Sequence, residues 1–396
     1  LVALTTSQVV VLTTDQIQAL TTEQLSNMTT AQVVSLTTAQ LVALTTDQVS
    51  NLATSQLVAL TTSQLQAIET DDLQALTTAQ LRALTTAQIA GLTTDQITNL
   101  TTLQLNSFKT AQLAGLSTKQ IVALTTDQIS NLATTQLAAL NSKQVTSIET
   151  DDLQALTTAQ LVAMTTAQVA VFTTDQVVAL TTDQMSNLKT AQLASLTAKQ
   201  VAVIETDDLV SLTTAQLVTL TTAQVAALST DQLQALTTAQ LGSLKTAQIS
   251  ALTTNQVVAM TTDQASNLKT AQIASMTTKQ VVSMETDDLV SLTTAQLVAL
   301  TTAQVAGLPT AQIGALTSTQ FAALSTASAG AVGTASIASL TTAMIASLST
   351  SQLTALSTVQ MAGLSTVSIA ALDTANGAAL TTAQIVAMST AQVAAF

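Results

Sequence analysis

The chain of 396 residues contains no histidine, cysteine, tryptophan or tyrosine. These residues provide most of the general bases, thiolate nucleophiles and ligands for haem, iron–sulfur clusters and zinc found in proteins. Their absence excludes most enzyme mechanisms, so we expect that the protein is not an enzyme and carries no resident cofactor. Proline occurs once, at Pro309, and phenylalanine four times.

Positive charge is also scarce. Nine lysines and arginines stand against 22 aspartates and glutamates, for a net charge of −13. Nucleic acid binding needs clustered basic residues and stacking aromatics, so no nucleic acid partner is expected. Apolar runs are interrupted by threonine and glutamine after about four or five residues, whereas a membrane span needs about 20. We therefore expect no membrane span, and nothing indicates a small-molecule substrate.

An eight-residue repeat takes the place of these features. The length equals 49 × 8 + 4, and we number the positions of each octad one to eight from Leu1. Position one is usually Leu, Ile or Val and position four is usually Leu. Threonine occupies position six in 46 octads and glutamine position eight in 40. The four leftover residues indicate a piece of a longer array.

Four features of the octad predict one short helix per repeat. Threonine at five and glutamine at eight have the spacing of a capping box, and the aliphatic residues at four and one form a hydrophobic staple around it. Aspartates gather at seven, in the first helical turn, where the helix dipole favours negative charge. Position three collects asparagine and glycine, which tolerate the left-handed conformation that ends many helices.

We therefore predict a helix from position six to position two, a left-handed residue at three and a new start at four. One detail stays open. The threonine at six is either the true N-cap or a residue that faces inward. The glutamine at eight is interpreted as a capping or ladder residue, not as part of a binding site.

A single octad buries too little to fold, so the octads should stack into an all-α solenoid. We expect an elongated rod whose interior is too narrow for aromatic side chains. A β-solenoid is the alternative, because Thr, Val and Ile favour strands. The octad lacks the two-residue alternation of a strand, however, which favours helices.

Four acidic octads interrupt the repeat, with Glu-Thr-Asp-Asp at positions five to eight. They lie 10, 7 and 10 octads apart, and other marked octads lie three apart. Duplication of blocks explains these intervals. They are also near-multiples of about 3.4 octads, which predicts about 27 residues per superhelical turn and acidic octads aligned along one side.

The acidic octads are the candidate metal sites, because calcium takes several carboxylate and carbonyl oxygens. The alternative is that these carboxylates only decorate helix N-termini and pair with nearby lysines. The candidate calcium ligands are Glu69, Asp71, Asp72, Glu149, Asp151, Asp152, Glu205, Asp207, Asp208, Glu285, Asp287 and Asp288.

The array divides by regularity into residues 1–308, which contain the four acidic octads, and residues 309–396, which continue the same solenoid less regularly. After Asp288 only Asp373 is charged. The nearly uncharged segment is either an irregular end of the array or a contact surface for another copy. Self-association into a fibre or bundle is therefore expected. Glutamine at eight is replaced in this segment by Ser328, Ser336, Met344, Ser368 and Asn376.

The motif L-T-T-A-Q-[LIV]-x-A-L, as in residues 76–84 and 156–164, resembles the octad arrays of very large bacterial surface exoproteins, which are adhesin-like and have long stalks. The resemblance covers essentially the whole chain and implies a secreted protein with a structural or adhesive role. We expect an extracellular or cell-surface structural protein that forms a rod or filament. The alternatives are a stalk that presents a binding domain located elsewhere, and a calcium- or surface-binding repeat module.

Overall fold

The computed structural model describes residues 1 and 3–396, and these residues form 49 short helices and no strand. A new helix begins every eight residues, so helix αn starts at residue 8n − 2, from α1 (Thr6–Val10) to α49 (Thr390–Ala394). The prediction of an all-α repeat is confirmed, and its β-solenoid alternative is wrong. The helices have four to six residues. Those with four residues are α17, α21, α25 and α27, and those with five are α1–α6, α9, α11–α16, α18, α31–α33, α42, α43, α45, α46 and α49; the others have six.

The chain divides into two compact units, residues 1–203 and residues 204–396. The first holds α1 to α25 (Ala198–Val201), and the second holds α26 (Thr206–Ser211) to α49. The predicted change in regularity at residue 309 falls inside the second unit, where α39 (Thr310–Ala315) begins on the same eight-residue schedule.

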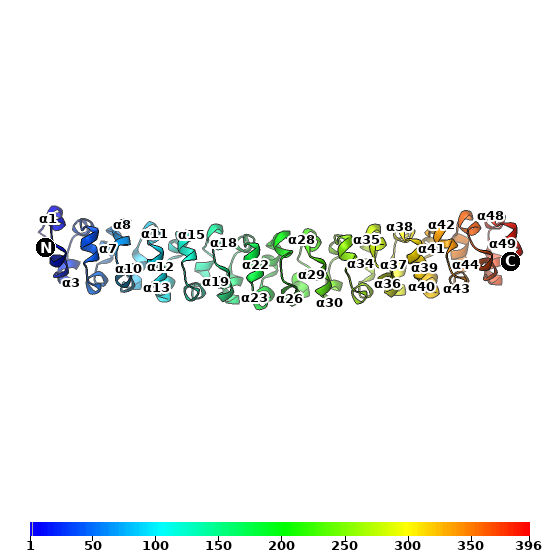
Figure 1. Ribbon diagram of the computed structural model, residues 1–396, viewed down its shortest axis with the longest axis horizontal. Coiled ribbons are helices and arrows are strands. Elements are labelled where there is room, and N and C mark those ends of the chain that lie inside the picture. The colour runs from blue at the N-terminus through cyan, green and yellow to red at the C-terminus, as the bar shows by residue number, and fades with distance from the viewer. Residues whose placement is uncertain (2) are drawn as a thin grey trace. The chain divides into compact units, whose positions relative to one another are not determined.

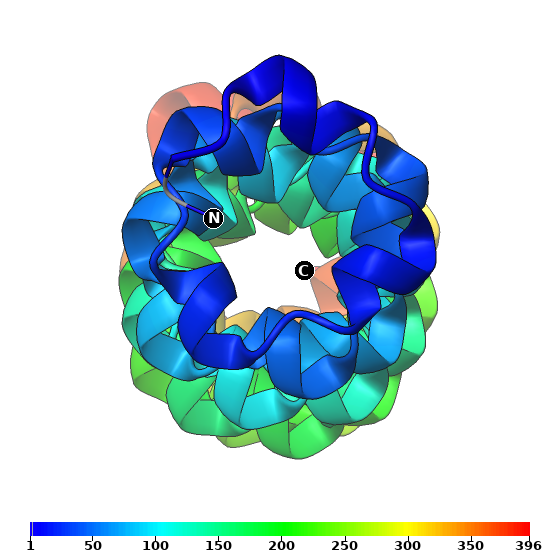
Figure 2. The same cartoon turned by 90° about the vertical axis from the view of Figure 1, so that its left-hand side faces the viewer.

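Within each unit the helices wind into a coil, and each packs against the helix three further along the chain. In the first unit α4 (Thr30–Val34) packs against α7 (Thr54–Ala59), and in the second α38 (Thr302–Gly307) packs against α41 (Thr326–Ala331). Figure 1 shows the succession of helices in each unit, and Figure 2 shows the first unit's helices arranged as a ring around its interior.

The period of the coil follows from hydrogen bonds made by position eight. Gln280 Nε2 donates to the carbonyl oxygen of Leu252, 28 residues earlier, at 2.7 Å. Asp288 Oδ1 accepts a hydrogen bond from Thr262 Oγ1, 26 residues earlier, at 3.0 Å. Bonds from position eight to the preceding coil thus span 26 to 31 residues, which corresponds to between three and four octads per turn and includes the predicted value of about 3.4.

Positions one and four fill the interior of the coil. Leu65 at position one is fully buried, and Leu60 at position four is 3% exposed. The expectation that the interior excludes aromatic rings is wrong, because Phe321 at position one is fully buried and Phe108 and Phe172 are nearly so. The octad after Phe321 carries only Ala329 at position one, which is also fully buried.

The helix ends also differ from the prediction, because no described residue has a positive φ. Asn99 at position three is right-handed, with φ −85° and ψ −3°, and the reversal comes instead from extended residues at four and five. Asparagine serves here because Asn99 Nδ2 donates to the carbonyl oxygen of Asp95 at 2.8 Å, which adds a second bond to the one from the Asn99 backbone N–H at 3.0 Å. The same bond is made by Asn27, Asn51, Asn131, Asn187 and Asn267.

Packing, and not backbone conformation, explains glycine at position three for Gly91 and Gly307, whereas at Gly115 and Gly363 an added Cβ would lie 3.5 Å from the nearest threonine atom, an ordinary contact. A Cβ atom on Gly91 would lie 2.9 Å from Thr62 Cγ2, and one on Gly307 would lie 2.6 Å from Thr278 Cγ2. Both threonines occupy position six of the preceding coil. The methyl group of this threonine therefore fills the space beneath position three, and glycine lets the two coils approach closely.

Candidate functional site

Each helix begins with the predicted capping box where the sequence provides one. At α16 (Thr126–Ser130) the N-cap is Thr125, whose Oγ1 accepts from the Gln128 amide N–H at 3.2 Å. The Thr125 N–H in turn donates to Gln128 Oε1 at 2.9 Å. The threonine at position five is thus the N-cap. The threonine at six, here Thr126, is the first helical residue and is exposed, so neither interpretation left open for position six is correct.

The other end of the glutamine side chain joins two coils. Gln128 Nε2 donates to the carbonyl oxygens of Ile97 at 2.9 Å, Thr98 at 3.1 Å and Leu100 at 2.7 Å. These carbonyls lie at the C-terminal end of α12 (Thr94–Thr98), where a helix lacks internal partners. One buried side chain therefore caps the start of its own helix and the end of the helix beneath it.

We call the glutamines at position eight from Gln32 to Gln392 the glutamine ladder. They are at most 9% exposed, whereas Gln8, Gln16 and Gln24 in the first coil are exposed. Burial of an amide is favourable only when its donors and acceptor are satisfied, and the ladder satisfies both. The interpretation of glutamine as a capping and ladder residue is confirmed.

The contacts between coils do not depend on the N-cap. Alanine replaces threonine at Ala53, yet Gln56 Nε2 still donates to the Met28 carbonyl at 2.8 Å. Pro309 has no N–H to offer, and Gln312 Oε1 is buried without a partner. Gln312 Nε2 nevertheless donates to the Met284 carbonyl at 2.7 Å. The bond to the preceding coil is the constant feature of the ladder.

The acidic octads replace this glutamine with a shorter aspartate. Asp152 in α19 (Thr150–Ala155) and Asp288 in α36 (Thr286–Ser291) are each 3% exposed. The N-cap glutamates of both helices make no side-chain capping bond. The Oδ2 atoms of both aspartates are buried and have no hydrogen-bond partner.

Burial raises the pKa of both carboxyl groups. For Asp152, desolvation is opposed by a hydrogen bond from Thr126, and the neighbouring charges of Glu149 and Asp151 raise the pKa further. The same combination acts on Asp288, whose pKa is raised by burial, Glu285 and Asp287 and lowered by Thr262. The two buried carboxyls thus interact with threonine and not with the lysines that one interpretation of the acidic octads invoked.

The candidate calcium ligands separate into two groups. The aspartates at position eight are buried. The glutamates at five and the aspartates at seven are exposed. In residues 1 and 3–396, no three carboxylates are placed so that they could hold a metal ion together. Calcium binding stays a prediction. The buried group is Asp72, Asp152, Asp208 and Asp288; the exposed group is Glu69, Asp71, Glu149, Asp151, Glu205, Asp207, Glu285 and Asp287.

Several of the last octads carry a residue other than glutamine at position eight. Asn376 Nδ2 keeps the bond to the coil beneath, donating to the Leu348 carbonyl at 3.0 Å. Ser336 Oγ instead pairs with Thr310 Oγ1 at 3.1 Å, and Met344 fills the position with apolar atoms. Residues 309–396 are therefore less regular in their ladder contacts, while their helices follow the common schedule.

The family model of the ALTTAQ repeat matches the chain at nine places that together cover more than half of its length. The chain belongs to the ALTTAQ repeat family. The six letters of the ALTTAQ motif correspond to positions three to eight, so the motif runs from the end of one helix through its N-cap to the ladder glutamine. The matched segments are residues 1–30, 22–54, 65–102, 102–134, 145–182, 201–238, 235–270, 281–318 and 289–326.

The matched ALTTAQ segments include all four acidic octads, so these octads are variants of the repeat and not insertions between repeats. Comparison with the curated proteins finds no match. None of the helices described for this ALTTAQ array has the length and apolar character needed to cross a membrane.

Proposed function

We propose that this ALTTAQ array is a structural protein of the bacterial cell surface, a rod or filament subunit of an extracellular appendage. The observation that carries the proposal is the glutamine ladder, which joins successive coils by the same bonds throughout each unit. Each bond is buried and involves backbone carbonyls, so it depends little on the surrounding side chains. Such a ladder suits a protein whose task is to maintain length and stiffness.

The distribution of polar groups supports a non-catalytic role. The buried side-chain amides are hydrogen-bonded in contacts between coils, and the interior positions are aliphatic. Catalysis by carboxylates needs a pair that converges on one substrate. Asp288 is buried beneath the surface while Asp287 beside it is exposed, so the two carboxylates do not present themselves together.

The first and the last coil each lack a neighbouring coil on one side. In the first coil Gln8, Gln16 and Gln24 are exposed, and each uses its Oε1 to cap its own helix. Their Nε2 groups are ready to donate to carbonyls of a coil beneath. A second copy offers such carbonyls at the end of its last coil, as would further octads of a longer chain.

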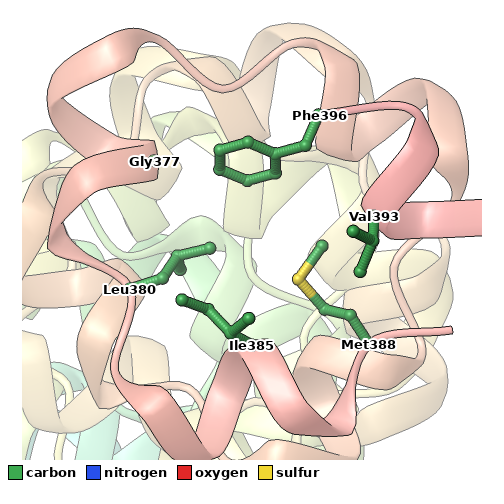
Figure 3. Close-up of a pocket in the computed structure, with 6 residues that line it drawn as sticks. All are labelled: Gly377, Leu380, Ile385, Met388, Val393 and Phe396. Carbon is green, nitrogen blue, oxygen red and sulfur yellow. The ribbon is translucent and has the colours of Figure 1, made fainter. Parts of the chain in front are cut away.

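The last coil leaves apolar side chains uncovered. Ile385, Val393 and Phe396 are 47%, 52% and 60% exposed, whereas interior residues at position one elsewhere are almost fully buried. With Leu380 and Met388 they surround a pocket of about 280 Å³, in which the Phe396 ring lies over Gly377 (Figure 3). A following coil, of this chain or of a second copy, would cover these side chains.

Negative-stain electron microscopy of the 396-residue chain tests the proposal. We expect fibres that lengthen with protein concentration, and we expect Ile385→Glu to shorten them by placing a charge in the end contact. Leu103→Glu is the matched control, because Leu103 is 72% exposed at position seven, away from both ends, and should leave fibres unchanged. Isolated particles of one length at every concentration would contradict self-assembly and favour a stalk that presents a separate adhesive domain.

A further inference from the structure

The acidic octads place oxygen atoms where the ladder places hydrogen-bond donors. In the octad before Asp288, Gln280 Nε2 donates to the carbonyls of Leu252 at 2.7 Å and Ile249 at 3.0 Å. The corresponding carbonyls for Asp288 belong to Met260 and Val257. A carboxylate offers them no proton, so the ladder bond to these carbonyls cannot form at Asp288.

The same arrangement occurs in both units. Asp152 in the first unit lies above Leu124, at the same interval of 28 residues that separates Asp288 from Met260 in the second. In each case the aspartate Oδ2 is buried without a partner, and a carboxylate has no N–H to donate to the Met260 or Leu124 carbonyl. Two independent coils thus leave the same buried carboxylate oxygen unsatisfied, at a cost that some ligand should relieve.

The space suits a cation better than a direct hydrogen bond. Aspartate is shorter than glutamine by one carbon–carbon bond, about 1.5 Å, so its oxygen ends about 4 Å from the carbonyl that a ladder Nε2 reaches. A direct bond from a protonated carboxyl needs about 2.5–3.0 Å. Two oxygens bound to one calcium ion lie about 3.3–5 Å apart, because each is about 2.3–2.6 Å from the metal.

The surrounding charge favours the same ligand. Glu149 and Asp151 add negative potential around Asp152, and Glu285 and Asp287 do so around Asp288. We propose that Asp152 and Asp288 each bind one calcium-type cation between coils, through Oδ2 and the carbonyl oxygens of Leu124 and Met260 respectively. Each site thus uses one buried carboxylate and backbone oxygens in place of a cluster of three acidic side chains. The proposal does not depend on the protein's structural role.

Calorimetric titration of the full chain with calcium chloride tests the site. The informative variant is Asp152→Gln with Asp288→Gln, because glutamine restores the ladder and should keep the protein folded. We expect this double variant to bind two fewer calcium ions than the wild type. Asp231→Gln removes the same charge from an exposed position seven and should leave the stoichiometry unchanged.

Thermal unfolding provides the second measurement. We expect calcium to raise the unfolding temperature of the wild type relative to a chelator, and the double variant to unfold at the same temperature in both. An unchanged stoichiometry in the double variant would overturn the proposal. So would a wild type that neither binds calcium nor gains stability from it, a result that would leave these carboxyls to be neutralised by protons.

Discussion

Removing one ladder glutamine from the middle of a unit should cost far more than removing an exposed glutamine from the first coil. In Gln128→Ala the carbonyl oxygen of Leu100 loses its 2.7 Å hydrogen bond from Gln128 Nε2, which is its ladder contact. Leu100 is buried. An orphaned buried acceptor costs about 1–3 kcal/mol. The lost bonds to Ile97 and Thr125 add about 0.5–1.5 kcal/mol each, for a total of about 2–6 kcal/mol.

Two substitutions serve as controls for this prediction. Gln16→Ala removes a capping bond to Thr13 from an exposed glutamine and should cost about 0.5–1 kcal/mol. Thr125→Ala removes only the N-cap hydroxyl from the same helix as Gln128, and a lost cap costs about 1 kcal/mol. It separates the effect of the ladder from that of position along the array, where terminal repeats are expected to be less stable.

Chemical unfolding followed by circular dichroism at the helical band measures the three variants. Hydrogen exchange should show that Gln128→Ala also loosens the amides of α12 and α16, because the ladder bond joins these two helices. The reasoning would be refuted if Gln128→Ala were no more destabilising than Thr125→Ala, since the contact between coils would then contribute nothing beyond the cap.

Three further outcomes are expected. Burial raises the folded-state pKa of Asp152 and Asp288 above the ordinary 3.8, so calcium-free protein should gain stability as the pH falls from neutral through their folded pKa values. Unfolding measured at several pH values should show that this gain disappears in the double variant Asp152→Asn with Asp288→Asn. Gly314→Ala should stabilise the protein by up to about 1 kcal/mol, because no atom lies within 4 Å of the added Cβ, whereas Gly307→Ala should destabilise it, because Thr278 is 2.6 Å away; thermal unfolding of the pair checks the difference. Phe321→Ala should cost about 3–5 kcal/mol in chemical unfolding, since it empties a fully buried site, and a cost below 1 kcal/mol would contradict the packing described for it.

The local structure was predictable because the residues that start each helix and form its buried face lie close together in the sequence. Thr125 and Gln128 specify a capping box by their spacing alone, and the aliphatic residues at four and one specify the buried face. A turn of between three and four octads could also be inferred, from the intervals between marked octads. These features depend on residues close in sequence or on repetition, both of which a single sequence displays.

Contacts between coils were not predictable in the same way. Asparagine and glycine at position three indicated a left-handed residue, but Asn99 acts through its side chain and Gly91 through its closeness to Thr62. Both reasons involve the three-dimensional neighbourhood, which sequence spacing does not reveal. Asp288 is likewise buried, while its neighbour Asp287 is exposed, because Asp288 occupies position eight of a helix whose orientation is fixed by packing.

The ladder also determines how such an array can change its length. Each bond joins position eight to backbone carbonyls at positions one, two and four of an earlier octad, and every residue type provides such a carbonyl. Adding or deleting whole octads therefore exchanges the partners without changing the chemistry of any bond. A one-residue insertion instead displaces every ladder pair that spans it, over more than three octads. Recombination in steps of eight residues is thus nearly neutral for stability, yet it rotates the acidic octads around the coil and so redistributes surface charge.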